Sequence, residues 1–370
     1  MILVHDKVSA ALNAGDLSGV QQALQAAIRL EHATIPPYLY ALYSLDPNRN
    51  AVLASILRSV VKEEMAHLIL AANTLSALGG TPVLDDPALL PRYPCQLPGT
   101  VEHGLLVHLA PFSIDLVRNT FMAIEQPEYP LSFGDTDFPG AAPAVPANGT
   151  SPANGASPAN GASTPATDGW PLTIGQFYRR IRANIAALGD GVFAPAARDQ
   201  VTTSLLPDVV AVTDVATACQ AIDTIISQGE GTSSTPAEVV GSDMAHYYRF
   251  LEVAHGRRLV QDPALGGRYT WCDTPVPFDP AGVYLVPADP RTADYPKGSP
   301  ARRACAAFNY SYTCLLKTLH ATCNGDPDQF GPAVGLMMSL QEQAIDMMTG
   351  ATTNGVPVGP SFDWQPGEDD

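Results

Sequence analysis

A long apolar helix is predicted to carry two ionisable side chains on its most apolar face. Residues 60–80 read VVKEEMAHLILAANTLSALGG, with apolar residues at the spacing of a helix that faces a core. Glu64 and His67 lie on this stripe rather than on the solvent face. A buried carboxylate is costly unless it is paired or binds a metal, and Glu-x-x-His directs both groups toward a common point. The segment therefore predicts a helical bundle with a polar site in its core.

The preceding segment shows the same anomaly. Apolar residues recur at helical spacing over about residues 17–45, LDPNRN interrupts the pattern, and a second helix is expected over about 50–78. Glu31 lies in the middle of the first apolar stripe. Glu31 and Glu64 are nearly equidistant from the connection between the helices, so antiparallel packing should bring both carboxylates to the same depth.

A second hairpin is expected later in the chain, from helices over about 214–231 and 235–258, the latter beginning at a proline. Glu230 continues an apolar stripe, and Asp243-x-x-His246 follows the turn at the same distance from its centre. Together the two hairpins give the ligand pattern of a four-helix carboxylate-bridged dimetal site, with aspartate in place of the last glutamate.

Each motif has a structural alternative. A lone Glu-x-x-His on a helix is more often an ion pair than a metal site, and only the joint pattern favours two metal ions. Glu63 could substitute for Glu64 but lies off the centre of the stripe, whereas Glu125, before a proline in FMAIEQPE, is a rival or supplementary ligand. Carboxylate and imidazole ligands suit two iron or manganese ions. The predicted ligands are Glu31, Glu64, His67, Glu125, Glu230, Asp243 and His246.

Composition narrows the class of protein. The chain has 370 residues, 46% of them apolar, which is enough for a sizeable core. Its formal net charge of −17 repels phosphate backbones and anionic membrane surfaces, so neither nucleic acid nor a membrane is an expected partner. No apolar run approaches the roughly 18 residues of a membrane span, and the N-terminus lacks the pattern of a secretory signal. A cytoplasmic location is expected.

The remaining segments are expected to surround this bundle. Proline-rich connections follow the first hairpin, and repeats of Pro-Ala-Asn-Gly at 140–168 predict a disordered surface insertion. Residues 259–300 should wrap the surface. Clean strand alternation is scarce, so a mainly α chain is expected, with a bundle domain at 1–258 and a C-terminal wrap and helical hairpin at 259–370. Further helices are predicted at 114–125, 173–188, 301–323 and 328–349.

Several motifs resemble a known family. LEHATIPPYLYALYSL, EEMAHLILAANTLSALGGTP, IEQPE, TIGQFYRRI, ISQGEG and MAHYYRFLEV are similar to the ferritin-like domain of iminophenyl-pyruvate dimer synthases, over about residues 18–258. Those enzymes join two amino-acid-derived imines on the way to violacein, and they are far longer multidomain proteins. The resemblance implies a ferritin-like four-helix bundle and suggests metal-dependent redox chemistry. The matching polar positions are Glu31, Glu64, His67, Glu125, Glu230 and His246.

The leading functional hypothesis is a non-haem di-iron oxidase or oxygenase that acts on a small, amino-acid-derived metabolite with dioxygen. The substrate is expected near Pro36 and Pro37, which should kink the first helix. One alternative is a non-catalytic iron-binding or ferroxidase-type protein, and another is a structural bundle with an ion-paired core. The added exterior segments disfavour a storage cage, so a monomer or small homo-oligomer is expected.

Overall fold

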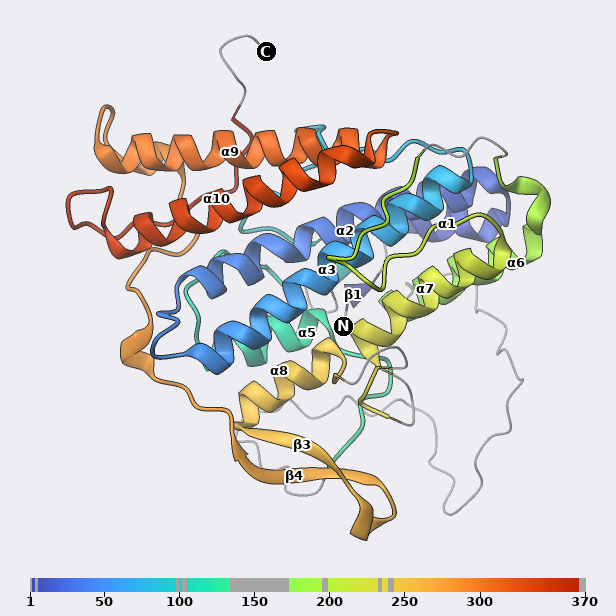
Figure 1. The fold of residues 1–370 in the computed structure, drawn as a ribbon, viewed down its shortest axis with the longest axis horizontal. Helices are drawn as coiled ribbons and strands as arrows, with labels where there is room; N and C mark the ends of the chain where they lie inside the picture. Colours follow the sequence, from blue (N-terminus) through green and yellow to red (C-terminus); the bar gives the residue numbers. More distant parts are fainter. Residues whose placement is uncertain are drawn as a thin grey trace.

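The structure is a computed structural model in which helices predominate (Figure 1). The predicted insertion at 140–168 lies outside the described residues. The structure describes residues 2–3, 6–97, 100–101, 105–133, 173–194, 199–231, 235–238 and 243–365.

The two longest helices form the spine of the molecule. Helix α2 (Leu17–Tyr43) and helix α3 (Ala51–Ala77) pack against each other along their lengths, which confirms the first predicted hairpin. Asp16 caps α2 by accepting a hydrogen bond from the Gly19 amide at 2.8 Å. Helix α2 continues through Pro36 and Pro37, whose rings are buried. Helix α3 is buried at every position from Ala66 to Ala77, so the pair provides a rigid wall for the site.

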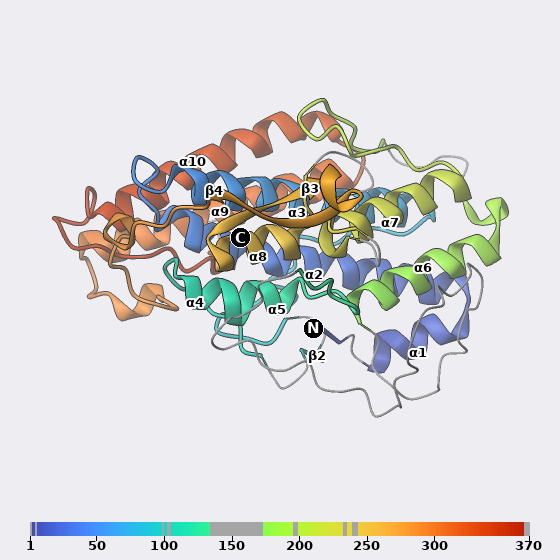
Figure 2. The ribbon, with the colours of Figure 1, turned by 90° about the horizontal axis from the view of Figure 1, so that it is seen from below.

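Shorter helices complete the bundle in two rows beside α2 and α3. We call these rows the short columns, and each of them is interrupted by non-helical chain. Helices α4 (Ile114–Leu116) and α5 (Met122–Ile124) flank a π-helical turn, η1 (Val117–Phe121), and α6 (Ile174–Leu188) follows them along the bundle. Helix α7 (Val215–Glu230) is followed in the same way by α8 (His246–His255). Figures 1 and 2 show both successions beside α2 and α3. Each column is therefore interrupted near the middle of the bundle.

Helix starts agree with the sequence where a capping residue is present. Thr173 and Asp214 form capping boxes with Gln176 and Thr217, and they fix the first turns of α6 and α7. The helix predicted over 235–258 was wrong in its first half, because α8 begins only at His246. Before it, the amides of Glu238 and Ala245 bond to the carbonyls of Asp243 and Pro236, so residues 236–238 and 243–245 pair with each other instead of forming helical hydrogen bonds.

The C-terminal third wraps the bundle and then covers it. Strands β3 (Arg257–Asp262) and β4 (Arg268–Pro275) form an antiparallel hairpin that the sequence pattern did not predict. Helices α9 (Pro300–Cys323) and α10 (Phe330–Thr349) form the expected last pair, on the outer side of α2 and α3 (Figure 1). Their apolar side chains share one core cluster with the bundle. The division into two domains stays a prediction.

The remaining elements are short. Helix α1 (Asp6–Ala14) packs on α2, and strands β1 (Ile2–Leu3) and β2 (Thr100–Val101) pair antiparallel. In the part of the chain that the structure describes, no helix is long and apolar enough to cross a membrane. Short 3₁₀ turns are η2 (Asp190–Val192), η3 (Pro263–Leu265), η4 (Pro280–Gly282), η5 (Thr292–Asp294) and η6 (Pro327–Gln329).

Candidate metal centre

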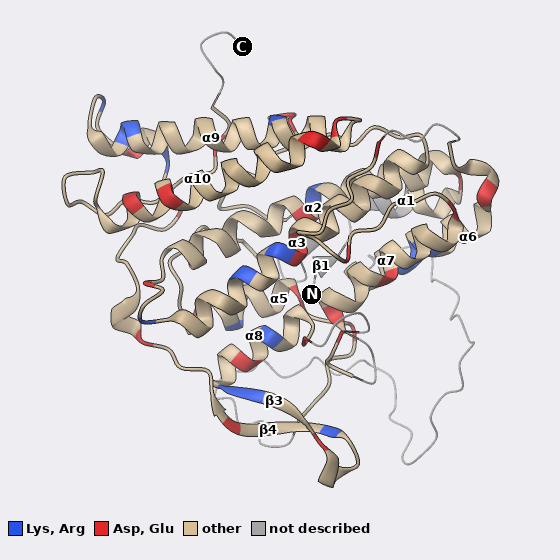
Figure 3. Ribbon diagram, in the orientation of Figure 1, with Lys and Arg blue, Asp and Glu red and all other residues tan. Residues whose placement is uncertain are grey.

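The breaks in the two short columns lie opposite the middle of the long helices. Glu125 directly follows α5, Glu230 is the last residue of α7, and His246 is the first residue of α8. Figure 3 shows acidic positions on α2 and α3 and at the end of α7 near the middle of the bundle. Side chains at helix ends thus meet side chains from helix interiors, within a core that is otherwise apolar.

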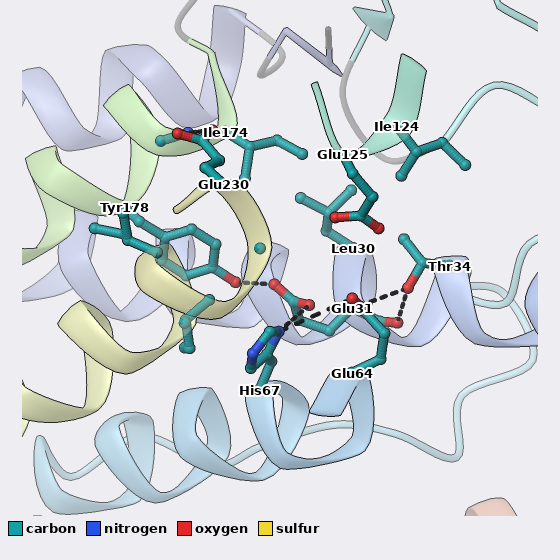
Figure 4. Close-up of a pocket in the computed structure, with 14 residues that line it drawn as sticks. Leu30, Glu31, Thr34, Glu64, His67, Ile124, Glu125, Ile174, Tyr178 and Glu230 are labelled. Atoms are coloured by element: carbon teal, nitrogen blue, oxygen red, sulfur yellow. Dashed lines mark hydrogen bonds and ion pairs between the residues drawn. The ribbon is translucent and has the colours of Figure 1, made fainter. Parts of the chain in front are cut away.

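Five of the predicted ligands form two groups that share one carboxylate. Ligand atoms of Glu31, Glu64 and His67 all lie within 4.8 Å of one another, and so do ligand atoms of Glu64, Glu125 and His246. The two imidazole rings face each other with centroids 5.4 Å apart. Figure 4 shows Glu31, Glu64, His67 and Glu125 directed into the same space. Each group could hold a metal ion, and Glu64 belongs to both.

Both histidines direct Nδ1 toward these carboxylates. His67 Nδ1 lies 3.6 Å from Glu31 Oε2 and 4.0 Å from Glu64 Oε1. His246 Nδ1 lies 2.8 Å from Glu64 Oε1 and 3.6 Å from Glu125 Oε2. This buried nitrogen makes no hydrogen bond to a described residue. The nitrogen faces two carboxylates, a setting that suits a cation shared with Glu64 and Glu125 as well as an ion pair with them.

The opposite nitrogens are held by residues that the sequence did not identify as functional. His67 Nε2 lies 3.0 Å from Gln228 Oε1, and His246 Nε2 lies 2.9 Å from Glu63 Oε2. Arg249 Nη2 binds both oxygens of Glu63, at 3.0 and 2.8 Å. If a metal were bound at Nδ1, these acceptors would hold the ring proton on Nε2. Such partners form only through tertiary packing, although Glu63 was noted beside Glu64.

Hydroxyl groups orient each carboxylate. The Tyr178 hydroxyl donates to Glu31 Oε1, and the Tyr38 hydroxyl donates to Glu125 Oε1. Thr34 donates to Glu64 Oε2 at 2.8 Å. Each carboxylate therefore keeps its other oxygen for a second partner. The sequence analysis did not single out Tyr178 or Thr34, and their packing against the centre is a tertiary feature.

Electrostatics show that the carboxylates crowd one another. Burial, together with the charge of Glu125, raises the pKa of Glu64 to about 7. Burial lowers the pKa of His246, but Glu125, Glu63 and Glu64 outweigh it and raise that pKa well above its ordinary value. Burial raises the pKa of Glu31, but the nearby His67 outweighs this effect and holds that pKa below its usual range. Without a metal, protons must supply the positive charge that this cluster requires.

Glu230 lies at the wall of the same cavity but outside both groups. Its Oε1 accepts a hydrogen bond from the Gly175 amide at 2.8 Å, and its Oε2 lies 3.6 Å from Arg179 Nη2. Burial raises the pKa of Glu230 to about 7. Figure 4 shows the side chain beside Ile174, away from Glu64. In this conformation Glu230 binds the start of α6 rather than the centre.

Asp243 is not brought to the centre. It is exposed, and it precedes α8 instead of lying one turn before His246 on a shared helix. The equal-distance argument that predicted Asp243 as a ligand assumed a helix from residue 235, which the structure does not have. Glu125, the rival candidate, occupies the corresponding place in the second group.

The space between these residues is small. The cavity has a volume of about 40 Å³. Apolar side chains from α2, α5, α6 and α7 surround the polar groups and limit access of water. The lining residues are Leu30, Glu31, Thr34, Glu64, His67, Ile124, Glu125, Ile174, Gly175, Tyr178, Ile225, Ile226, Gly229 and Glu230.

Comparison with known proteins gives a family match and a similar solved structure. The model of the ferritin-like family matches residues 24–255. The crystal structure of a ferritin-like protein from Caulobacter vibrioides is similar with a TM-score of 0.58 and 23% sequence identity, covering 92% of this chain and 97% of that chain. At that identity the likeness shows the fold alone. No curated protein matches the chain.

Proposed function

The chain belongs to the ferritin-like family, and we propose that it is a dimetal oxidase or oxygenase that binds two iron ions. The observation that carries the proposal is the pair of buried ligand groups that share Glu64. The inward-facing Nδ1 atoms of His67 and His246, each within 4.0 Å of two carboxylates, support a cation in each group. Carboxylate and imidazole donors suit iron, and manganese has similar ligand preferences.

Each proposed position has its own ligands. Glu31 and His67 would hold one ion, Glu125 and His246 would hold the other, and Glu64 would bridge them. Bound ferrous iron would supply the electrons that reduce dioxygen. The chain itself orients the ligands through Tyr38, Tyr178 and Thr34, as described above, and surrounds them with apolar walls that exclude water.

The proposed substrate is a small, amino-acid-derived metabolite. The resemblance of the sequence motifs to iminophenyl-pyruvate dimer synthases supports this chemical class. The cavity of about 40 Å³ holds roughly three water-sized groups. A substrate as large as an amino acid would therefore bind only if the helix ends around Glu125, Glu230 and His246 move apart. These ends are the breaks in the short columns, where such a movement disturbs the fewest helical hydrogen bonds.

Iron content and oxygen consumption test the proposal. Protein reconstituted anaerobically with ferrous iron should hold two ions per chain and, on exposure to air, should consume dioxygen faster when an amino-acid imine is present. Glu64→Ala should lose both ions, because it removes the shared ligand. Asp243→Ala is the matched control, since it removes an exposed carboxylate outside both groups. A reconstituted protein without iron would contradict the proposal.

A ferroxidase-type protein without an organic substrate is the second candidate, and the small cavity favours it. In that case dioxygen consumption would stop once the bound ferrous iron is oxidised, and no imine would change its rate or extent. The same experiment therefore separates the two candidates. Light scattering adds a second criterion, because a storage role requires a large shell and a monomer or dimer argues against it.

A further inference from the structure

The two halves of the proposed centre are closely matched in their nearest groups. Each has one carboxylate of its own, one histidine facing inward through Nδ1, and a share of Glu64. Each unshared carboxylate accepts a hydrogen bond from one tyrosine, Tyr178 for Glu31 and Tyr38 for Glu125. A difference in metal affinity between the halves must therefore come from farther out. We call them the His67 position and the His246 position.

The His67 position is backed by a neutral amide. Gln228 Nε2 donates to Asp208 Oδ2 at 3.1 Å, and a carboxylate can only accept, so the orientation of the amide is fixed. Gln228 Oε1 then faces His67 Nε2 at 3.0 Å. The negative charge of Asp208 is thus one side chain removed from the imidazole.

The His246 position is backed directly by a carboxylate. Glu63 Oε2 lies 2.9 Å from His246 Nε2. Arg249 binds the same carboxylate and also contacts Glu238, so Glu63 is held in place beside His246. A carboxylate that accepts a hydrogen bond from Nε2–H increases the electron density on the ring more than an amide oxygen does. Nδ1 is then a stronger ligand for a metal.

We infer that the two metal positions are unequal and fill in order, the His246 position first, because Glu63 backs His246 whereas Gln228 backs His67. The inference rests on the proposed dimetal function and deepens it. Arg249 acts as a positioning residue, since it holds Glu63 against His246 without reaching the metal. An ordered pair would give one ion that stays bound and a second that exchanges more readily.

Variants that keep one position measure the two affinities separately. His67→Ala keeps the His246 position, and His246→Ala keeps the His67 position. Titration of the metal-free proteins with Co²⁺, followed by visible absorption, should give a dissociation constant about 10-fold or more lower for His67→Ala, the size expected for a change of the group behind a ligand. Equal constants, or the opposite order, would overturn the inference.

Exchanging the backing groups tests the cause. Glu63→Gln gives His246 an amide partner like that of His67, and it should weaken the tighter Co²⁺ step by about 10–100-fold, so that the two steps merge. The double variant Gln228→Glu with Asp208→Asn moves a carboxylate next to His67 at constant net charge. It should tighten the weaker step by about 10-fold. If Glu63→Gln disturbs folding, the double variant alone tests whether the group behind each histidine sets the Co²⁺ affinity, because Glu63 and Arg249 are intact in it.

The outcomes distinguish the inference from the proposed function. If two Co²⁺ ions bind and neither exchange changes the dissociation constant of either step, the dimetal proposal stands. The ordered filling is then overturned. Binding of no Co²⁺ to the parent protein overturns both. Circular dichroism of each variant confirms that the affinities refer to folded protein.

Discussion

At the scale of the residue, Glu230 connects the centre to the stability of the metal-free protein. Its pKa is raised to about 7 by burial, from 4.5. As the pH rises above 4.5, the unfolded chain releases this proton before the folded protein does. The contribution of protonated Glu230 to the free energy of unfolding is therefore fully present below pH 4.5, and it is lost as the pH rises through about 7. The loss amounts to about 3 kcal/mol at about 1.4 kcal/mol for each pKa unit.

Glu230→Gln should remove this dependence. The variant keeps an oxygen to accept the Gly175 amide but carries no charge, so urea unfolding of the metal-free protein should show it to be more stable than the parent above pH 7 and similar at pH 4. Metal content should stay at two ions per chain. A variant that loses an ion would show that Glu230 moves into the centre and is a ligand after all.

How far the sequence predicts these residues depends on where they lie. Glu31, Glu64 and His67 are in the interiors of long helices, where periodicity shows the buried face directly. Glu125 and His246 lie at helix ends, where periodicity says little. Glu125 was named from its place before a proline in FMAIEQPE, and His246 from its spacing after Asp243. Glu63, Gln228 and Arg249 act through contacts between elements far apart in sequence, which no local pattern records.

At the scale of the element, the site depends on how the broken columns meet. Helix α6 begins beside the end of α7, and a Cβ added at Gly175 would lie 2.2 Å from Glu230 Oε2. Glycine at this position lets the α6 amide bind the carboxylate. The sequence predicted both helices to within a residue or two from their apolar periodicity, which is a local signal, but it could not predict that their ends face each other.

Gly175→Ala should therefore displace Glu230 and break its bond to the α6 amide. We expect a loss of about 1–3 kcal/mol in the free energy of unfolding, the usual cost of leaving a buried polar group unpaired. Gly191→Ala is the control, because a Cβ there meets nothing within 4 Å. Equal stability of the two variants in urea would mean that the Glu230 contact contributes little.

At the scale of the whole molecule, the fold was more predictable than its organisation. The mainly helical, ferritin-like architecture followed from periodicity and resemblance, and the family match confirms it. The start of α8 and the β3–β4 hairpin did not follow, since loops and edge strands take their structure from the surfaces that they cover. The relation between the bundle and the C-terminal helices is also a tertiary property: α9 and α10 bury apolar residues in the same cluster as α2 and α3.

One shared core predicts one cooperative unfolding transition rather than separate transitions for the bundle and for the C-terminal helices α9 and α10. Trp364 packs against the large core at the C-terminal end, and Trp271 stacks on His255 at the end of α8, with ring centroids 3.7 Å apart. In a Trp170→Phe background, variants that keep only one of these tryptophans should show fluorescence transitions at the same urea concentration, because separating α9 and α10 from α2 would expose apolar surface on both sides. An earlier Trp364 transition, with the Trp271 signal intact, would instead show that α9 and α10 unfold independently of α8 and the β3–β4 hairpin.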